Sequence, residues 1–396
     1  MNSCALLRSK YKRSGDYTSS FQSFLNTSLL FFLAQARRLT SHYLEMRCLL
    51  SILPFACTTL AALQYKGVDW SSTLVSESQG QAYTGLDGNE KPLERILKNN
   101  GVNTVRQRIW VDPENGDYDV DYNIELAKRA KAVGLDVYLD FHYSSTWADP
   151  AHQTTPSAWS SLGLDDLAAR LQSYTTSSLD AFADAGIAPS IVSIGNEITA
   201  GMLWPVGEMG DGDGAYNLAT LLHAASAGVK ASTLRPTPQI MLHLDNGWKA
   251  DTQQWWYDTV LAAGPLSVAD FDIQGVSYYP FYDSAATLSA LSSSLSSLKA
   301  TYGKAIVVAE TDWPTSCPSP EFAFPADAQD IPFSTAGQRE WVVRVAEAVE
   351  GAGGQGLFYW EPAWTGNGAL GSSCENNLMF SWEGRAEGSV RVFGQI

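Results

Sequence analysis

The stretch Ile191-Val-Ser-Ile-Gly-Asn-Glu-Ile198 joins the start of a buried strand to a polar end that packing does not explain. Four of its residues are Ile or Val, which is typical of a strand buried on both faces of a parallel sheet. The carboxylate of Glu197 follows a few positions later. Because placing a carboxylate at the end of a buried strand costs free energy, we expect Glu197 to be a catalytic acid.

Similar short runs, rich in Ile, Val and aromatic residues, recur along the chain with amphipathic helical patterns between them. The eight predicted strands span residues 65–69, 102–110, 135–142, 191–197, 240–245, 271–279, 305–310 and 356–361. Helical spacing of apolar residues predicts helices that include residues 93–97, 124–131, 288–298 and 335–349. The last of these opens with Thr335-Ala-Gly-Gln338, which predicts a capping box.

Strict alternation of strand and helix, repeated eight times, predicts an α/β fold with a closed (β/α)₈ TIM barrel in a single domain. The rival fold is a doubly wound open sheet. That fold requires a glycine-rich phosphate turn after the first strand, and Gly67-Val-Asp-Trp-Ser-Ser72 is not such a turn. Long segments after the third, fourth and seventh strands would lie on the active face of a barrel.

The N-terminal residues have a different character from the rest of the chain. Residues 46–61 have a basic start, an apolar stretch and small residues at the end, which predicts a signal peptide cleaved near Ala61. Residues 1–45 have no place ahead of a signal peptide. We interpret them as a misassigned extension, with translation starting at Met46; a transit peptide or an alternative signal are the other possibilities. The catalytic barrel is then residues 62–396, secreted to the extracellular space.

Export also bears on the cysteines and on possible partners. After cleavage only Cys317 and Cys374 remain, and two cysteines in an extracellular chain predict one disulfide rather than two free thiols. On the chain-entropy model that loop closure stabilises the fold by about 4 kcal/mol. The formal net charge of −16 makes nucleic acid and anionic membranes poor partners. We expect a monomer.

Barrel active sites are built from the carboxyl ends of the strands, so the polar residues there are the candidates. They are Asp69, Arg106, Arg108, Asp140, His142, Asn196, Glu197, His243, Asp245, Tyr278, Tyr279, Glu310, Asp312, Trp360 and Glu361. The set contains no nucleophilic Ser or Cys. With no HExxH or CxxC motif and with scattered His residues, neither a metal nor a cofactor is predicted. The acidic segment 208–214 lacks the ligand spacing of an EF-hand loop.

Tryptophans also gather at or just beyond the predicted strand ends, where they could form platforms for the apolar faces of sugar rings. They are Trp70, Trp110, Trp147, Trp204, Trp248, Trp313, Trp360 and Trp364. Paired carboxylates among aromatic platforms predict glycoside hydrolysis. Glu197 and Glu310 each end an Ile/Val-rich strand and are the favoured pair, with Asp245 and Glu361 as competitors. Asp69 and Asp140 are expected to hold neighbouring Arg or Tyr side chains.

A series of motifs in order resembles glycoside hydrolase family 53, the endo-β-1,4-galactanases, and most closely the secreted fungal ones. The motifs are Val105-Arg106, Phe141-His-Tyr-Ser144, Trp147-Ala-Asp-Pro150, Gly195-Asn-Glu-Ile198, His243-Leu-Asp-Asn-Gly247, Ser277-Tyr-Tyr-Pro-Phe281, Glu310-Thr311 and Tyr359-Trp-Glu-Pro362. The resemblance runs from about residue 62 to residue 396.

The resemblance implies hydrolysis of β-1,4-galactan, the polysaccharide of pectin side chains, by a retaining double displacement without a cofactor. Glu197 would be the acid/base and Glu310 the nucleophile. Arg106 would steady the nucleophile and Asn196 would bind the sugar 2-hydroxyl. The full set of expected substrate-binding residues is Arg106, His142, Asn196, Asp245, Asn246, Tyr279, Trp313 and Trp360. One departure is Ser145, which stands where the family pattern has Asp.

Two other functions are kept open. The first is another retaining β-glycanase of the same clan, such as a mannanase or a cellulase, which would share Arg106, Asn196, Glu197 and Glu310. The second is a non-catalytic barrel that only binds carbohydrate. Such a barrel would have no reason to keep two strand-end glutamates, and turnover of any β-glycan excludes it.

Overall fold

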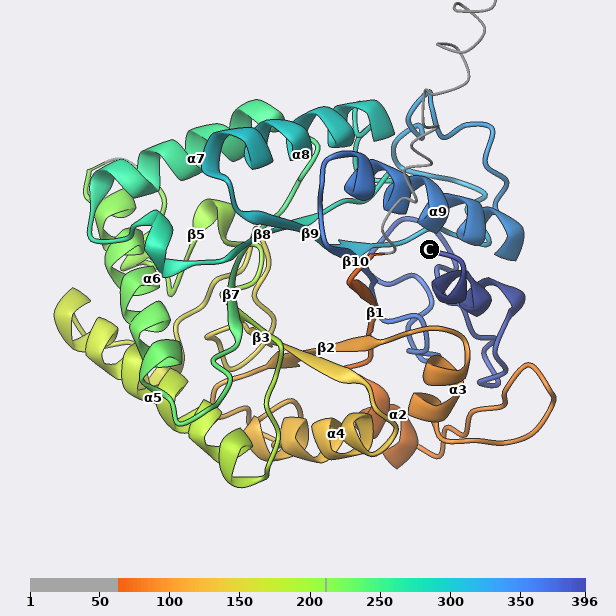
Figure 1. Ribbon diagram of the computed structural model, residues 1–396, viewed down its shortest axis with the longest axis horizontal. Helices are drawn as coiled ribbons and strands as arrows, with labels where there is room; N and C mark the ends of the chain where they lie inside the picture. Colours follow the sequence, from red (N-terminus) through yellow and green to blue (C-terminus); the bar gives the residue numbers. More distant parts are fainter. Residues whose placement is uncertain (1–62, 211) are drawn as a thin grey trace, which may run out of the picture. The chain divides into compact units, whose positions relative to one another are not determined.

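Eight parallel strands close into a barrel in the computed structural model, which describes residues 63–210 and 212–396 (Figure 1). The strands are β1 (Tyr65–Asp69), β2 (Thr104–Ile109), β3 (Asp136–Phe141), β4 (Ile191–Ile194), β7 (Gln239–Leu244), β8 (Ile273–Ser277), β9 (Ala305–Thr311) and β10 (Gly356–Tyr359). Each pairs with its neighbours in chain order, and β10 pairs with β1 to complete the ring. The predicted (β/α)₈ barrel is confirmed. The expectations for residues 1–45 and 46–61 lie outside the described residues.

Helices follow most of the strands and surround the ring (Figure 1). They are α2 (Thr73–Ser78), α3 (Leu93–Asn99), α4 (Val120–Ala132), α5 (Leu164–Asp184), α6 (Gly214–Ala231), α7 (Ala250–Ala263), α8 (Leu288–Tyr302) and α9 (Thr335–Gly351). The Ser-rich stretch before Tyr302 is helical, as its leucine spacing predicts. After β10, however, the expected helix is replaced by the 3₁₀ helix η4 (Gly388–Gly394).

The start of α9 differs from its prediction. The N-cap is Ser334, one residue earlier than predicted, and its hydroxyl accepts a hydrogen bond from the Gly337 backbone N–H. The predicted capping box is wrong, because Gly337 has no side chain with which to complete one. The amide of Gln338 therefore does not cap the helix. It lies buried and donates to the backbone carbonyl of Trp313 at 3.1 Å, and so links the helix to the segment after β9.

Alternation of side chains along each strand divides the barrel interior into an apolar and a polar layer. The apolar layer is one cluster of buried side chains, made of Tyr65, Tyr138, Ile191, Met241, Ile273, Val307, Ala309 and Phe358. Two residues further along β3 and β7, on the same face, stand Asp140 and His243 in place of apolar residues. The interior thus becomes polar toward the carboxyl ends of the strands.

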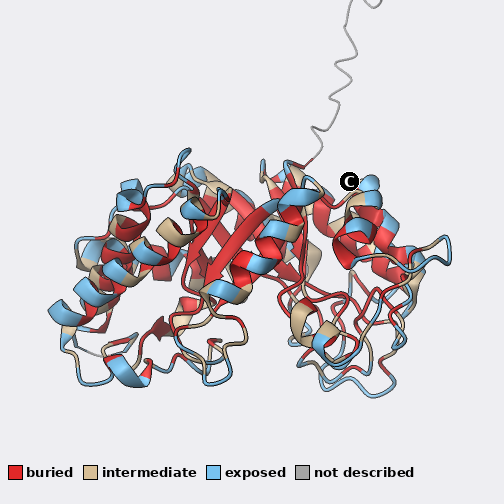
Figure 2. Ribbon diagram, turned by 90° about the horizontal axis from the view of Figure 1, so that it is seen from below, coloured by how far each residue is buried: buried red, intermediate tan, exposed pale blue. Residues whose placement is uncertain are grey.

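The outer faces of the strands and the inner faces of the helices form the larger hydrophobic core. Figure 2 shows the central strands largely buried and the surrounding helices with buried and exposed residues alternating along them. In α4, for example, Leu126, Ala127 and Ala130 are buried, as the helical spacing of the sequence indicates. Within the described residues no helix is both long and apolar enough to cross a membrane.

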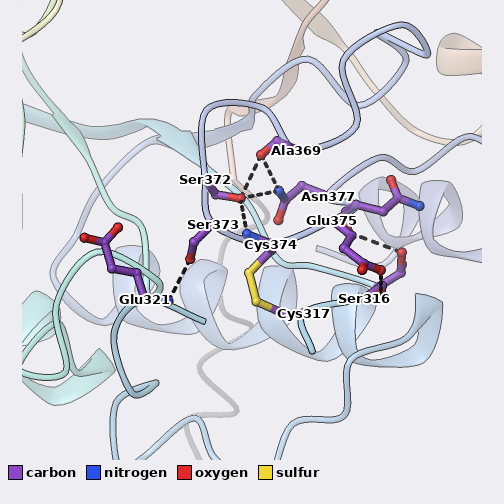
Figure 3. Close-up of a disulfide and its surroundings, with 11 residues drawn as sticks. Ser316, Cys317, Glu321, Ala369, Ser372, Ser373, Cys374, Glu375 and Asn377 are labelled. Atoms are coloured by element: carbon purple, nitrogen blue, oxygen red, sulfur yellow. Dashed lines mark hydrogen bonds between the residues drawn. A yellow bond between two sulfur atoms is a disulfide. The ribbon is translucent and has the colours of Figure 1, made fainter. Parts of the chain in front are cut away.

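Long connections extend from the carboxyl ends of the strands. The connection after β4 contains the 3₁₀ helix η2 (Ile198–Ala200) and a small antiparallel pair, β5 (Gly201–Met202) with β6 (Gly207–Glu208), which the sequence did not predict. The connections after β9 and β10 are joined by the expected disulfide between Cys317 and Cys374 (Figure 3). Hydrogen bonds from Asn377 to Ala369 and Ser372 hold the second of these connections around the disulfide.

Candidate active site

A cavity of about 570 Å³ opens at the carboxyl ends of the strands. The expected site residues that line it are Arg106, His142, Asn196, Glu197, Asp245, Asn246, Tyr279, Glu310 and Trp360. The structure therefore brings together residues from seven different strands and the segments that follow them. Trp313 is the exception, and its position is described below.

The backbone around Glu197 is set by a sharp turn at the end of β4. The strand ends at Ile194, earlier than predicted, and Gly195 has a φ of 122°. A side chain at Gly195 would bring a Cβ within 2.6 Å of Ile198, so only glycine fits there. Glu197 itself has the left-handed values φ 49° and ψ 49°, which are uncommon for a residue with a side chain. Strain of this kind is concentrated at functional positions.

Glu310 reaches the barrel interior because β9 contains an irregularity. Val276 pairs with Val308, but the next residue, Ser277, pairs with Glu310, so one residue of β9 is inserted between them. Both Val307 and Ala309 belong to the interior apolar cluster. Strict alternation would then direct Glu310 outward. The extra residue re-aims its carboxylate into the cavity, as bulges beside active sites commonly do.

Arg106 is the cation at the centre of the site, with only 1% of its side chain exposed. Its Nη1 is 2.7 Å from Asp69 Oδ2, and its Nη2 is 2.7 Å from Asp140 Oδ2. The same Nη2 lies 2.8 Å from Glu310 Oε1 and donates to Asn196 Oδ1 at 2.7 Å. The expectation that Asp69 and Asp140 hold an arginine is therefore met.

Two neighbours of this cluster have their orientation fixed by the backbone of Ala148. Asn196 Nδ2 donates to the Ala148 carbonyl at 2.7 Å, which leaves its second N–H free for a ligand. His142 Nδ1 accepts from the Ala148 N–H at 3.0 Å, and its Nε2 lies 3.2 Å from Asp140 Oδ2. His142 is therefore the neutral tautomer with the proton on Nε2, in agreement with the lowering of its pKa by burial.

The two glutamates have different surroundings. Glu310 Oε2 accepts a hydrogen bond from the Tyr279 hydroxyl at 2.7 Å, while Oε1 is paired with Arg106. Burial raises the pKa of Glu310, but Arg106 and Tyr279 oppose that rise. Burial raises the pKa of Glu197 well above its usual range, and the charges of Glu310 and Asp245 raise it further. Of the two, Glu197 has no paired cation among the described residues, and its pKa is raised further.

A second buried cation lies beside the first. Arg108 Nη1 is 2.6 Å from Glu361 Oε1, and its Nη2 donates to the Ser72 hydroxyl at 2.6 Å. Ser72 also donates to Glu361 through its backbone N–H, at 2.9 Å. Glu361 is thus engaged in structural contacts, although burial still raises its pKa to about 7. It does not line the cavity and is no longer a competitor for a catalytic role.

Half of the expected tryptophan platforms reach the cavity. Those that line it are Trp147, Trp248, Trp360 and Trp364. Trp313 does not: it is fully buried, donates from Nε1 to the Pro332 carbonyl at 3.0 Å, and stacks on Trp341. The expectation that Trp313 binds substrate is therefore not supported by its position. Trp70, which is also buried, does not line the cavity either.

Several residues of the cavity were missed by the sequence reasoning. They are Ser277, Tyr282, Asn367, Leu370 and Gly371. Tyr282 follows the Ser277–Phe281 motif directly, so its position was a usable signal. Asn367, Leu370 and Gly371 lie in the long connection after β10. The sequence of this connection has no strand or helix pattern from which their positions could be predicted. Ser145 does not line the cavity, so its departure from the family pattern concerns the loop rather than the cavity wall.

The donor set of the cavity suits a carbohydrate rather than a metal ion. In the described part of the chain, no group of three or more His, Cys, Asp or Glu side chains is arranged to hold a metal. Carboxylates, three side-chain amides and four indole rings instead offer hydrogen-bond partners for hydroxyl groups and flat faces for sugar C–H groups.

Comparison with known proteins agrees with this geometry. The model of glycosyl hydrolase family 53 matches residues 65–393. The chain is 56% identical over 336 residues to an arabinogalactan endo-β-1,4-galactanase of Humicola insolens, which covers 85% of this chain and all of that protein. A second protein of the same description, from Thermothelomyces thermophilus, is also 56% identical, with the same coverage.

Solved structures give the same result. The structure of a fungal β-1,4-galactanase superposes with a TM-score of 0.82 at 56% identity, covering 85% of this chain and 100% of that chain. A family 53 catalytic domain from Ignisphaera aggregans superposes with a TM-score of 0.73 at 31% identity, over 85% of this chain and 97% of that one. The family recognised from the sequence motifs is confirmed. The chain is a glycoside hydrolase and belongs to glycosyl hydrolase family 53.

Proposed function

We propose that this chain is an endo-β-1,4-galactanase that cleaves β-1,4-galactan with retention of anomeric configuration. The observation that carries the proposal is that two glutamates in one cavity have different hydrogen-bond partners and different electrostatic surroundings. Glu310 is paired with Arg106 and accepts from Tyr279, so it suits an ionised nucleophile. The pKa of Glu197 is raised by burial and by Glu310, so it suits a general acid.

The substrate is inferred from the relatives and from the lining of the cavity. The Humicola insolens and Thermothelomyces thermophilus proteins are both described as arabinogalactan endo-β-1,4-galactanases. The cavity is open at the strand ends and lined by four indole rings, which suits a chain of hexose units lying across it. A polysaccharide cut within its length fits such a cavity.

The mechanism is a double displacement. Glu310 attacks the anomeric carbon and forms the galactosyl-enzyme, while Glu197 gives its proton to the leaving glycosidic oxygen. Water then attacks the anomeric carbon. Glu197, now ionised, takes a proton from that water, and the bond to Glu310 breaks to release the galactan fragment with the β configuration kept at its new reducing end. The carboxyl groups of the two glutamates are expected to lie about 5–5.5 Å apart, as retention requires.

The neighbours of the two glutamates have supporting roles in this mechanism. Arg106 holds Glu310 in its ionised form and in one orientation. The free N–H of Asn196 is available to the sugar 2-hydroxyl, because its other N–H and its oxygen are already used. Hydrogen bonds to that hydroxyl strengthen in the transition state and accelerate the reaction.

We also propose that the enzyme is exported, with cleavage near Ala61. Support comes from the signal-like pattern of residues 46–61 and from the Cys317–Cys374 disulfide, since disulfides persist in oxidising compartments. N-terminal sequencing of protein collected from culture medium tests this directly. A first residue far upstream of Ala62 would contradict it.

The substrate and the stereochemistry are tested together. The enzyme should release reducing ends from potato galactan much faster than from mannan or cellulose. Proton nuclear magnetic resonance during the first turnovers should show the β-anomer as the first product. Preference for mannan or cellulose would favour another β-glycanase of the clan. A first product of α configuration would overturn the retaining mechanism and the assignment of Glu310.

The loss of activity caused by replacing Glu197 should depend on the leaving group of the substrate. Glu197→Ala should lower kcat on galactan by about 10²–10⁴-fold, since that is the usual contribution of a general acid. An aryl galactoside whose phenolate leaves readily needs less protonation, so its first step should lose far less. Glu208→Ala, an exposed glutamate in the connection after β4, is the matched control. Equal losses on both substrates would argue against the acid role.

The hydrogen bond from Tyr279 should set the acidic limb of the pH profile. The hydroxyl donates to the ionised form of Glu310, so Tyr279→Phe should raise the pKa of Glu310. The acidic limb of kcat/KM then moves to higher pH, and kcat falls by roughly 10–100-fold because a hydrogen bond to a charged group is lost. Tyr278→Phe is the control, since that hydroxyl donates to the Ala286 carbonyl. An acidic limb that stays in place contradicts the assignment.

A further inference from the structure

Arg108 has no place in the mechanism above, although it lies beside Arg106 on β2 and only 1% of its side chain is exposed. Both of its terminal nitrogens are used: Nη1 is paired with Glu361 and Nη2 donates to Ser72. Glu361 follows β10 and Ser72 follows β1. The guanidinium is therefore held in one plane by groups from two separate segments of the chain.

The guanidinium also lies against two aromatic rings. The guanidinium carbon is 4.3 Å from the centre of the Tyr118 ring and 4.3 Å from the centre of the Trp147 ring. At these distances a cation is attracted to the face of each ring, and the attraction is stronger where water is excluded. Tyr118 is itself buried, so Trp147 is pressed against a fixed support.

Trp147 in turn packs against the ring of Trp364. Its indole stacks on that of Trp364, with ring centres 6.1 Å apart and an interplanar angle of 20°. Trp364 is also tied to the Arg108 cluster by its backbone N–H, which donates to the Glu361 carbonyl at 3.2 Å. Both indoles line the cavity and remain partly exposed to it.

We propose that Arg108 is a positioning residue for substrate binding, which holds Trp147 and Trp364 as one rigid aromatic wall for sugar units of the polysaccharide. The role rests on the proposed function, because the wall has a use only if the ligand is a sugar chain. Arg108 acts through the two indoles. Although Arg108 borders the cavity, its two terminal nitrogens are engaged by Glu361 and Ser72, and only 1% of its side chain is exposed to a ligand.

A rigid wall matters because ordering side chains during binding costs free energy. Two indoles that are already stacked and supported lose little freedom when a sugar ring packs against them. Lysine could not replace Arg108 here. An ammonium group is compact, so it cannot contact both rings and also donate to Glu361 and Ser72 in a fixed plane.

The first test is Arg108→Lys in the complete enzyme. KM for β-1,4-galactan should rise roughly tenfold, the effect expected when about one desolvated cation–π contact is lost. The fall in kcat should be smaller than the rise in KM, because Glu197 and Glu310 are not touched. The near-ultraviolet circular dichroism of the free enzyme should also change, since the stacked pair of indoles loses its support.

The matched control is Arg129→Lys. Arg129 also pairs with two carboxylates, Glu77 and Glu94, and lies near the ring of Trp70, but it is remote from the cavity. Its substitution should leave KM, kcat and the near-ultraviolet spectrum as they are in the parent enzyme. Any loss of melting temperature that the two variants share then reports the removal of a paired arginine in general.

A second pair of variants decides the question even if Arg108→Lys does not fold. Tyr118→Leu removes the supporting ring behind Arg108 without touching the cavity lining, and it should raise KM in the same direction. Tyr118→Phe keeps the ring and loses only the hydroxyl contact with Ser72, so it should raise KM less than Tyr118→Leu does.

The outcomes separate this inference from the proposed function. If the parent enzyme does not cleave galactan, the proposed function fails. If the parent cleaves galactan but the folded variants lose kcat at unchanged KM, or keep the parent spectrum, the positioning role of Arg108 is overturned. Equal KM values for Tyr118→Leu and Tyr118→Phe would overturn it as well.

Discussion

The buried guanidinium of Arg106 is the interaction on which the rest of the site depends. It is bonded to Asp69 after β1, Asp140 on β3, Asn196 after β4 and Glu310 on β9. No covalent link joins these segments at this end of the barrel, so their relative positions follow from shared contacts to one cation. Removing one partner of such a pair costs roughly 3–5 kcal/mol, because the other charge stays buried without compensation. That cost keeps the strand ends in a single arrangement.

The same cluster explains why the pKa of Glu197 is raised. Carboxyl groups outnumber guanidinium groups at this end of the barrel, and Arg108 is already paired with Glu361. Asp312 lies buried with neither oxygen in a hydrogen bond, and burial together with Glu310 raises its pKa well above the usual range. Glu197, like Asp312, is buried near other carboxylates and forms no salt bridge with an arginine in the described part of the chain. A buried carboxyl without a paired cation is more stable in its neutral form, and this is the state that the acid role proposed for Glu197 requires.

The ring of strands could be predicted from the sequence because each strand carries a local signal. A short apolar run with alternating sides is enough to place Tyr138 in the apolar interior and Asp140 two residues further, on the same face. The aim of Glu310 could not be predicted in this way. Alternation of side chains along β9, starting from the inward-facing Val307, predicts that Glu310 points outward. It points inward because β9 has one extra residue in its pairing with β8, and the sequence of β9 alone does not show this irregularity. Trp313 was misplaced for a related reason, since its stacking on Trp341 of α9 depends on how a helix packs.

The segments just beyond the strands share a property that composition does not reveal. Tyr143, Glu197, Asn246 and Glu361 all have positive φ, between 44° and 52°, although none is glycine. Each such position costs of order 1–3 kcal/mol and persists only where the surroundings determine it fully. The apolar layer inside the barrel and the strand ladders are those surroundings. Local sequence preferences therefore predict the strands and helices, whose packing stabilises the fold. They fail at the few positions where that packing holds a carboxylate, an amide or a tyrosine in a backbone conformation that the residue itself disfavours.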